Sequence, residues 1–357
     1  MNKILSKPPA SSATLHIKKL LKNIALIATA GFIGHSYGDV QPLSVSGNKI
    51  LAGNQVASFA GNSLFWSNNG WGGEKFYNAG TVGWLKSDWK SQLIRAAMGV
   101  DEGGGYLQDP VGNKAKVKAV VDAAIANDMY VIIDWHSHHA EQYQSQSIAF
   151  FQEMARTYGN TNNVIYEIYN EPLDNASWSG TIKPYAQAVV SAIRGIDPDN
   201  LIIVGTRTWS QRVDEAASDP VAGKNIAYTL HFYASSHGQY LRDIAQTALN
   251  KNAALFVTEW GSVNASGDGA VNYSETNAWV EFMKKNKTDP RSNERSLAKL
   301  KLESEAVKKA LSLGNSAGFN QESLVDGVDF SSTINRSRYE LLATKVFASF
   351  VRLVESA

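Results

Sequence analysis

The feature that most constrains the fold is a regular alternation of short apolar runs with amphipathic helical patterns between about residues 55 and 286. The apolar runs are rich in β-branched and aromatic residues, and they number seven: 56–66, 92–99, 130–136, 164–172, 201–206, 226–233 and 254–261. Apolar positions recur three to four residues apart in the segments between or after them, at 114–128, 147–159, 182–196, 240–252 and 272–286. Near-continuous apolar strands that alternate with helices predict a parallel sheet buried on both faces.

Seven strand–helix units are one short of a (β/α)₈ barrel, in which eight parallel strands close into a ring and the chemistry lies at their C-terminal ends. After residue 286 the chain becomes polar and turn-forming, and a Lys/Glu-rich helical pattern follows at 297–313. Two strand patterns within 316–335 and a last amphipathic pattern at 337–356 end the chain. We therefore predict an α/β fold, a TIM (β/α)₈-type barrel truncated after its seventh unit, and then a small α+β helix-hairpin-helix segment. We predict the boundary near residues 286–290, between domains at 39–286 and 287–357.

The N-terminus has the order of a secretory signal. Basic residues at Lys18, Lys19 and Lys22 precede the apolar run at 24–34 and a stretch of small and polar residues. We predict a signal peptide over residues 1–38, with cleavage near Gly38 and a secreted or periplasmic mature protein. The alternative is a membrane anchor, but the run is shorter than the roughly 20 residues that a span needs. No other segment has the length and apolarity of a span, so we expect no membrane association after signal removal.

Composition excludes several other classes of function. The formal net charge is +1 and the basic residues are dispersed, so no electrostatic footprint for nucleic acid stands out. The chain contains no cysteine, which excludes disulfides, thiolate metal sites and cysteine nucleophiles. A neutral substrate is favoured over a polyanion, and we expect no nucleic-acid partner.

Two carboxylates stand where a barrel has its active face. The fourth apolar run ends in Asn170-Glu171-Pro172, and the seventh contains Thr258-Glu259-Trp260. The ends of parallel strands meet at one edge of the sheet, so Glu171 and Glu259 are expected to converge on one cleft. Paired carboxylates are the minimum equipment for glycosidic hydrolysis, because one protonates the leaving oxygen while the other attacks the anomeric carbon or activates water.

Tryptophans at predicted strand ends support a sugar substrate. Five occupy such positions: Trp66, Trp71, Trp135, Trp209 and Trp260. Flat apolar rings offer stacking area to the C–H faces of sugars. Any one of them alone is more often structural, but five at strand ends favour carbohydrate binding, and we select Trp66, Trp71 and Trp209 as substrate-binding candidates.

Six motifs together resemble the bacterial endoglucanase (cellulase) subgroup of glycoside hydrolase family 5 over about residues 41–286. They follow the family's order at 63–78, 93–99, 131–138, 168–172, 228–234 and 257–261. The resemblance implies a retaining endo-β-1,4-glucanase that acts on β-1,4-glucan polysaccharides or oligosaccharides, without a cofactor or metal. Mannan or xylan is the alternative substrate, since the same carboxylates serve several β-1,4-linked polymers.

The resemblance also implies residue roles. Glu171 matches the acid/base and Glu259 the nucleophile, while Asn170 matches the residue that binds the sugar 2-hydroxyl. His136 matches a histidine of the same subsite. The residues that match the surroundings of the two carboxylates are Arg95, His231 and Tyr233. Independently of the family, a guanidinium near Glu259 favours its ionised form, and a tyrosine hydroxyl can hold one of its oxygens in place.

Structural alternatives to these roles remain open at this level. His231 and Tyr233 lie two apart on one strand, which also suits an inward hydrogen-bonded pair. Arg95 could be a structural ion-pair partner. The cluster from Asp134 to His139 contains metal-ligand residue types, although a single run does not establish a coordination geometry.

The family pattern ends at the junction. Family members continue into an eighth strand that ends in a tryptophan beneath the cleaved sugar, whereas this chain has no tryptophan after Trp279. Residues 287–357 instead resemble the outer part of the second lobe of the Hsp70-superfamily ATPase domain. Glu305, Lys308 and Ser312 match its adenosine-contacting positions, but the phosphate loops and the first lobe are missing, so we expect no useful nucleotide binding.

The missing unit leaves two further interpretations of function. An open parallel sheet exposes unpaired backbone groups and apolar edge surface, which impairs a barrel enzyme. The alternatives to an enzyme are a carbohydrate-binding protein without turnover and a chaperone-fragment interaction protein.

Overall fold

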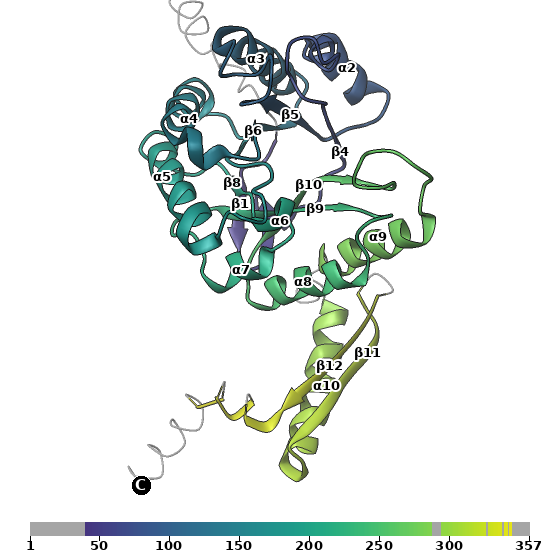
Figure 1. Ribbon diagram of the computed structural model, residues 1–357. Coiled ribbons are helices and arrows are strands. Elements are labelled where there is room, and N and C mark those ends of the chain that lie inside the picture. The colour runs from purple at the N-terminus through teal and green to yellow at the C-terminus, as the bar shows by residue number, and fades with distance from the viewer. Residues whose placement is uncertain (1–39, 288–293, 326–327, 338, 342, 345–357) are drawn as a thin grey trace, which may run out of the picture.

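The computed structural model describes residues 40–287, 294–325, 328–337, 339–341 and 343–344 (Figure 1). The predicted signal peptide, the exact junction at 288–293 and most of the last helical pattern lie outside the described residues.

The main sheet has seven parallel strands in chain order, with each strand paired to the next. These strands are β4 (Gly61–Ser63), β5 (Leu93–Gly99), β6 (Tyr130–His136), β7 (Val164–Glu167), β8 (Ile202–Val204), β9 (Ile226–Tyr233) and β10 (Leu255–Gly261). All seven predicted strands are confirmed. In the described part of the chain the sheet ends at β4 and β10, which are not paired with each other, so the barrel lacks one strand.

Helices cover the outer face of this sheet (Figure 1). The longer ones are α2 (Ala79–Ser87), α3 (Pro110–Ala126), α4 (Gln144–Tyr158), α5 (Lys183–Arg194), α8 (Gln239–Asn250) and α9 (Tyr273–Lys287). Short turns of helix are η1 (Glu74–Phe76), η2 (Ala140–Tyr143), η3 (Trp178–Ile182), α6 (Arg207–Ser210) and α7 (Val213–Ser218). Local chemistry sets their starts: the side chain of Asp109 accepts from Gly112 N, and Pro110 stands at the first position of α3, where its missing N–H costs nothing. The five helices predicted within the barrel are confirmed, with ends that differ by a few residues.

Strand alternation divides the barrel into two cores. One side of β5 and β6 packs against the helices through residues such as Ile94, Met98 and Ile133. The other side faces the barrel interior, where Leu93 and Ile132 belong to a second apolar cluster at the N-terminal end of the strands. Farther along the same inward face stand Arg95, Asp134 and His136, so the interior changes from apolar to charged toward the C-terminal strand ends.

A three-stranded antiparallel meander precedes the barrel and was not predicted. It consists of β1 (Leu43–Ser46), β2 (Lys49–Ala52) and β3 (Gln55–Val56). Leu43 and Ile50 pack into the inner apolar cluster, so the meander closes the bottom of the barrel. Gly47 and Gly53 occupy its turns with φ of +61° and +59°, a conformation that glycine adopts without steric cost.

Strand β10 is far less covered than its neighbour β9. Seven of the eight residues of β9 are buried, whereas only Thr258 of β10 is. Trp260 points outward, stacks on Phe232 and remains 44% exposed. Phe256 stacks on Phe59 with ring centroids 6.0 Å apart, which joins β10 to the chain just before β4 at the lower end of the gap. The exposure of β10 is what loss of an eighth unit produces, because that unit would supply the next strand and helix.

The C-terminal segment contains α10 (Glu294–Leu313) and an antiparallel hairpin of β11 (Ser316–Val325) and β12 (Val328–Asn335). Its predicted helix and hairpin are confirmed. Val307, Leu311 and Phe319 form a small core of their own, separate from both barrel cores. Across the described residues, no helix has the length and apolar character needed to cross a membrane.

Candidate active site

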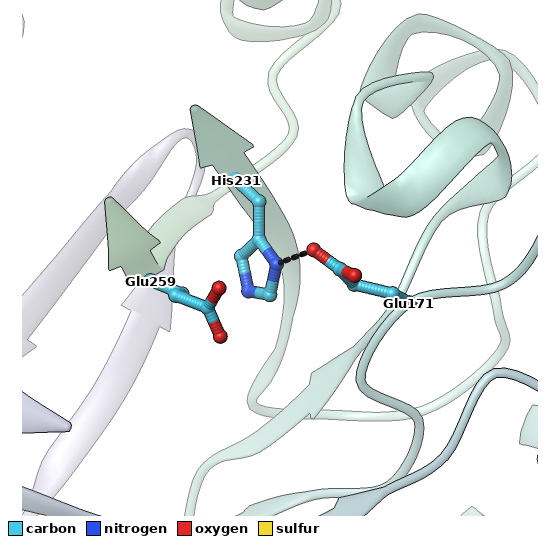
Figure 2. Close-up of side chains that lie close together, drawn as sticks. All are labelled: Glu171, His231 and Glu259. Carbon is cyan, nitrogen blue, oxygen red and sulfur yellow. Dashed lines mark hydrogen bonds and ion pairs between the residues drawn. The ribbon is translucent and has the colours of Figure 1, made fainter. Parts of the chain in front are cut away.

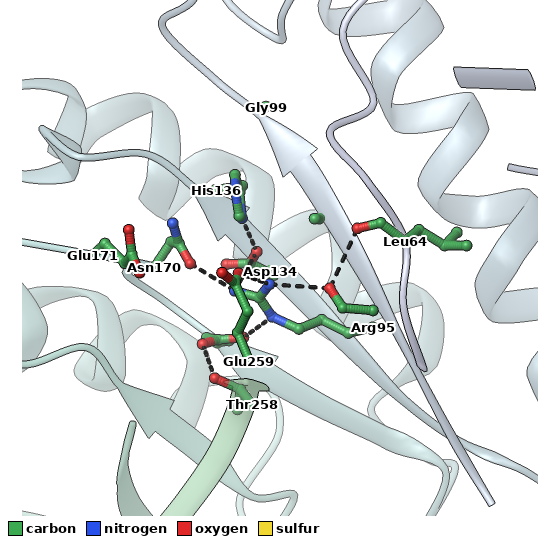
Figure 3. Close-up of polar contacts among 12 residues, drawn as sticks. Leu64, Arg95, Gly99, Asp134, His136, Asn170, Glu171, Thr258 and Glu259 are labelled. Carbon is green, nitrogen blue, oxygen red and sulfur yellow. Dashed lines mark hydrogen bonds and ion pairs between the residues drawn. The ribbon is translucent and has the colours of Figure 1, made fainter. Parts of the chain in front are cut away.

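Arg95 is the centre of a buried polar network at the C-terminal ends of the strands (Figure 3). Its Nε donates to Oε2 of Glu167 at 2.7 Å. Its Nη2 lies 2.8 Å from Oδ2 of Asp134 and donates to Oδ1 of Asn170 at 2.7 Å. Its Nη1 donates to Oε2 of Glu259 at 3.1 Å. One guanidinium therefore links β5, β6, the end of β7 and β10, and bridges from β5 to the far edge of the open sheet.

Glu259 is held as an ionised carboxylate. Its Oε1 accepts from the Tyr233 hydroxyl at 2.5 Å, and its Oε2 accepts from Arg95. Burial opposes ionisation, but the charges of His231 and Arg95 outweigh it and lower the pKa of Glu259 to about 2. An anionic oxygen on β10 is therefore present at any ordinary working pH.

Glu171 faces Glu259 across the cleft and is bound by His231 (Figure 2). Its Oε1 lies 2.8 Å from Nδ1 of His231, whose Nε2 lies 2.8 Å from Oγ1 of Thr258. Burial lowers the pKa of His231, but the hydrogen bond to Glu171 and the nearby carboxylates raise it above its usual value overall. One ligand atom from each of Glu171, His231 and Glu259 lies within 4.8 Å of the other two, so the two carboxylates share one small space.

His136 is a buried neutral ring. Its Nδ1 lies 2.6 Å from Oδ2 of Asp134, and the edge of its ring meets Trp66 with centroids 4.2 Å apart. Burial, together with the charge of Arg95, lowers the pKa of His136 to about 3. Burial raises the pKa of Asp134 to about 7 against the opposing effect of Arg95.

The three selected tryptophans lie beside this network. Trp66 stacks on Trp71 at 5.3 Å, and Trp71 is 43% exposed. Trp209 is 44% exposed and has φ of +54°, in a run of three left-handed residues from 208 to 210. Its N–H donates to the Pro172 carbonyl, and Oγ of Ser210 donates to the Asn170 carbonyl. A strained backbone tied to the loop that carries Glu171 fixes an exposed ring near the cleft, as functional loops often do.

Two of the five strand-end tryptophans are not at the cleft. Trp135 is completely buried between β6 and α4, against Phe150 and Phe151. Trp260 lies on the outer side of β10 against Phe232. Each directly adjoins an inward residue in its strand, so alternation turns it toward the helices.

Several residues of the network were not predicted. Glu167 is completely buried, and its Oε1 accepts from Thr258 at 2.7 Å and from Thr229 at 3.2 Å. Burial raises its pKa, and the charge of Arg95 opposes that shift. Ser63 also accepts from Arg95, at 3.2 Å. In the sequence, Glu167 is a charged residue inside an apolar run. A buried charge of this kind is expected to have a partner, but the sequence does not show which residue the partner is.

The site does not favour a metal ion. Within the described residues, Glu171, His231 and Glu259 form the one group of three that could present ligand atoms to a cation. Both ring nitrogens of His231 and both oxygens of Glu259 already have protein partners, and the Arg95 charge occupies the adjacent space. The residues of the cluster from Asp134 to His139 have separate protein partners. Asp134 pairs with His136, while Nδ1 of His138 lies 3.1 Å from the Glu171 carbonyl.

The adenosine-site matches of the C-terminal segment lie on the solvent side of α10. Glu305 and Lys308 approach to 3.9 Å, and Oγ of Ser312 donates to the Lys308 carbonyl. The opposite side of the helix carries Val307 and Leu311 into the segment's own core. This arrangement is that of a solvated helix face, and the absence of useful nucleotide binding stays a prediction.

Paired carboxylates at the ends of the fourth and seventh strands of an α/β barrel, flanked by exposed tryptophans, define a glycoside hydrolase. The family model "Cellulase (glycosyl hydrolase family 5)" matches residues 47–291, and the chain belongs to this family. Endoglucanase Z of Dickeya dadantii (strain 3937) is 66% identical over 286 residues, which are 79% of this chain and 67% of that protein. An endoglucanase of Clostridium saccharobutylicum is 46% identical over 248 residues, 68% of this chain and 54% of that one.

Solved structures of similar proteins also superpose on this chain. A protein from Cytophaga hutchinsonii superposes with a TM-score of 0.67 at 50% identity, covering 70% of this chain and 80% of that one. The catalytic domain of Thermobifida fusca endoglucanase Cel5A superposes with a TM-score of 0.65 at 32% identity, covering 70% and 83%. A second family model, "Hsp70 protein", matches residues 275–357 and overlaps the cellulase match across most of α9. This chain spans 67% of the length of the Dickeya dadantii protein and 54% of the length of the Clostridium saccharobutylicum protein.

Proposed function

We propose that this chain is a retaining endo-β-1,4-glucanase that hydrolyses cellulose-type β-glucans by double displacement. The observation that carries the proposal is that one carboxylate oxygen of Glu171 lies within 4.8 Å of one carboxylate oxygen of Glu259. Retaining enzymes hold their carboxyl groups about 5–5.5 Å apart for direct attack, whereas inverting enzymes leave roughly 6.5–9.5 Å for a water. The relatives named endoglucanases support the substrate class.

In the first step, the ionised Glu259 attacks the anomeric carbon while Glu171 protonates the leaving oxygen. The C–O bond to the leaving sugar breaks as a covalent glycosyl–Glu259 ester forms. Asn170 assists by binding the 2-hydroxyl, because Arg95 holds its Oδ1 and leaves its amide hydrogens available to donate. In the second step, water attacks the anomeric carbon while Glu171 takes its proton, and the ester C–O bond to Glu259 breaks. This restores the protonated Glu171 and the Glu259 carboxylate.

The remaining candidates position these groups. Arg95 and Tyr233 orient the two oxygens of Glu259, and His231 orients Glu171. Trp66, Trp71 and Trp209 supply stacking surface for neighbouring sugar rings, while His136 lies against Trp66. A variant of the Thermobifida fusca enzyme was solved in complex with cellotetraose, which supports a cellooligosaccharide as ligand here.

We further propose a secretory signal at residues 1–38, a barrel domain at 39–286 and an Hsp70-like segment at 287–357. The missing eighth unit removes one wall of the cleft and impairs activity, and the bridge from Arg95 to Glu259 preserves the catalytic pair across the open edge. The localisation that follows is extracellular or periplasmic.

The test is hydrolysis of soluble cellulose, mannan and xylan by purified residues 39–357, with the first-formed anomer followed by proton NMR. We expect the highest kcat/KM on the β-glucan and initial release of the β-anomer. Initial release of the α-anomer would refute the retaining mechanism. A higher kcat/KM on mannan or xylan would mean that this polymer, and not the β-glucan, is the substrate. Tight cellooligosaccharide binding without turnover on any polymer would favour a binding protein instead.

Removal of a stacking ring has a moderate expected effect. Trp71→Ala weakens cellooligosaccharide binding by about tenfold, or about 1.4 kcal/mol, because an exposed aromatic platform is lost. Isothermal titration of the Glu259→Gln background measures the affinity without turnover. Trp84→Ala is the matched control, since Trp84 is 53% exposed on α2 beside Trp89 and touches none of the candidates. Equal affinity in the Trp71 and Trp84 variants would remove Trp71 from the binding surface.

A further inference from the structure

A chain of three hydrogen bonds runs from Glu171 into the barrel interior, and Figure 2 shows the first of them, between Glu171 and His231. Glu171 Oε1 lies 2.8 Å from His231 Nδ1, and His231 Nε2 lies 2.8 Å from Thr258 Oγ1. Thr258 Oγ1 donates to Glu167 Oε1 at 2.7 Å. Except for Glu171, which borders the cleft, every member is buried.

The inner end of this chain accepts hydrogen bonds only. Three donors converge on the Glu167 carboxylate: Arg95 Nε at 2.7 Å, Thr258 Oγ1 at 2.7 Å and Thr229 Oγ1 at 3.2 Å. Burial raises the pKa of Glu167, but three donors including the Arg95 guanidinium point at its two oxygens, an arrangement that suits an ionised carboxylate with no proton to donate. A hydroxyl has a single proton, so Thr258 gives its proton to Glu167 and its oxygen can only accept from His231.

We propose that Thr258, anchored by Glu167, is a positioning residue that places a proton on Nε2 of His231 and thereby keeps a proton in the bond between His231 Nδ1 and Glu171. This inference rests on the proposed acid/base role of Glu171. With Nε2–H fixed, a neutral His231 offers only a lone pair at Nδ1, and Glu171 must donate its own proton there. If the ring is charged, Nδ1–H donates to the Glu171 carboxylate, and the same bond still contains one proton.

Loss of the proton between His231 Nδ1 and Glu171 is disfavoured, because each of the two arrangements that remain contains an unsatisfied hydrogen-bonding group. Either a lone pair on Nδ1 faces the Glu171 carboxylate, or the ring moves its proton from Nε2 to Nδ1. In the second case, Nε2 becomes an acceptor, and the Thr258 hydroxyl must turn away from Glu167 and leave a buried acceptor short of a donor. The device therefore keeps one proton in the bond between His231 and Glu171, where it is ready for transfer to the leaving group.

Other charged groups face the pair and stay in place when Thr258 is altered. Nδ1 of His138 lies 3.8 Å from Glu171 Oε2, and Glu259 lies on the strand opposite. The groups that interact electrostatically with Glu171 or His231 from the neighbouring elements are Arg95, Asp134, His136, Glu167, Tyr233, His237 and Glu259. Among these groups, only Glu167 loses a hydrogen bond when Thr258 becomes Val, and Thr229→Val also removes a donor from Glu167. A shift of the pH profile that is confined to Thr258→Val therefore reports on the bond between Thr258 and His231.

The experiment compares Thr258→Val with Thr258→Ser and Thr229→Val. The valine has the same shape without a hydroxyl, the serine restores the hydroxyl, and Thr229 binds Glu167 without touching His231. We expect Thr258→Val to move the alkaline limb of the kcat/KM profile on soluble cellulose down by about one pH unit, a tenfold loss above it. Thr258→Ser and Thr229→Val keep the wild-type limb. An unchanged limb in Thr258→Val, or the same shift in Thr229→Val, overturns the proposal.

A second readout does not need activity. Ring ¹⁵N shifts of His231, assigned by their loss in His231→Asn, are followed from about pH 5 to about pH 9 to identify the neutral tautomer. We expect Nε2–H in the wild type and in Thr258→Ser, and Nδ1–H in Thr258→Val. A neutral wild-type ring with Nδ1–H overturns the proposal. If the wild type hydrolyses no polymer, the proposed function fails while the tautomer is still decided by these spectra.

Discussion

Glu259→Gln abolishes hydrolysis of soluble cellulose, with kcat falling by about 10³-fold or more, while cellooligosaccharides still bind. The amide keeps the shape of the side chain and one acceptor oxygen, but it has no negative charge with which to attack the anomeric carbon. Arg95 and Tyr233 both donate to the wild-type carboxylate, so the substitution removes a group whose ionisation the site is arranged to favour.

Initial rates and calorimetric affinities, measured on the same preparations, separate turnover from binding. Glu281→Gln is the matched control, because Glu281 lies on the exposed side of α9, where it pairs with Lys284. The control should keep wild-type rates. Substantial turnover by Glu259→Gln would mean that the attacking group lies elsewhere or that water attacks directly.

Arg95→Met lowers the free energy of unfolding by about 3–5 kcal/mol, because removing one partner of a buried charge network leaves the others uncompensated. Asp134 and Glu167 are completely buried and depend on this guanidinium, and Asn170 also loses its donor. Urea unfolding followed by tryptophan fluorescence measures the change. Arg212→Met is the matched control: its pairs with Asp214 and Glu215 are partly exposed, so its effect should stay within about 1 kcal/mol. Equal losses in the two variants would mean that Arg95 is not a structural centre.

The same substitution changes the acidic limb of the pH profile. Glu259 has a pKa lowered to about 2, so the stability and activity that its ionisation supplies are complete above its ordinary value and are lost as pH falls toward 2. Without Arg95 the carboxylate loses a favourable charge and its pKa rises. In whatever fraction of Arg95→Met remains folded, the acidic limb of kcat/KM is therefore expected to move to higher pH.

The strands and the positions of the catalytic candidates could be predicted because both depend on local pattern. Seven apolar runs could form a buried parallel sheet, and strand ends that share an edge bring Arg95, Glu171 and Glu259 together. The tryptophans show where this reasoning was incomplete. Trp135 and Trp260 are at strand ends, but they directly adjoin His136 and Glu259, and alternation sends them to the opposite side.

Partners inside the barrel could not be predicted in the same way. Glu167 and Thr258 are visible as polar residues in apolar runs, but their mutual bond joins positions 91 residues apart and depends on the register of β7, β9 and β10. The meander was missed because its strands are short, although the glycines at 47 and 53 mark its turns. Pattern identified the elements, and only their packing identified which buried charges are paired.

The uncovered edge at β10 has a consequence for how this protein responds to warming. Peripheral elements with few buried contacts open at lower free energy than the rest of a fold, and β10 is such an element. Glu259 is carried by this strand, whereas Arg95 and His136 lie on the fully buried strands β5 and β6, and Glu171 follows the buried strand β7. The two members of the proposed catalytic pair are therefore expected to lie in regions of different local stability. We therefore expect hydrolysis to be lost, as the edge frays and Glu259 departs with it, at a temperature where most of the barrel is still folded.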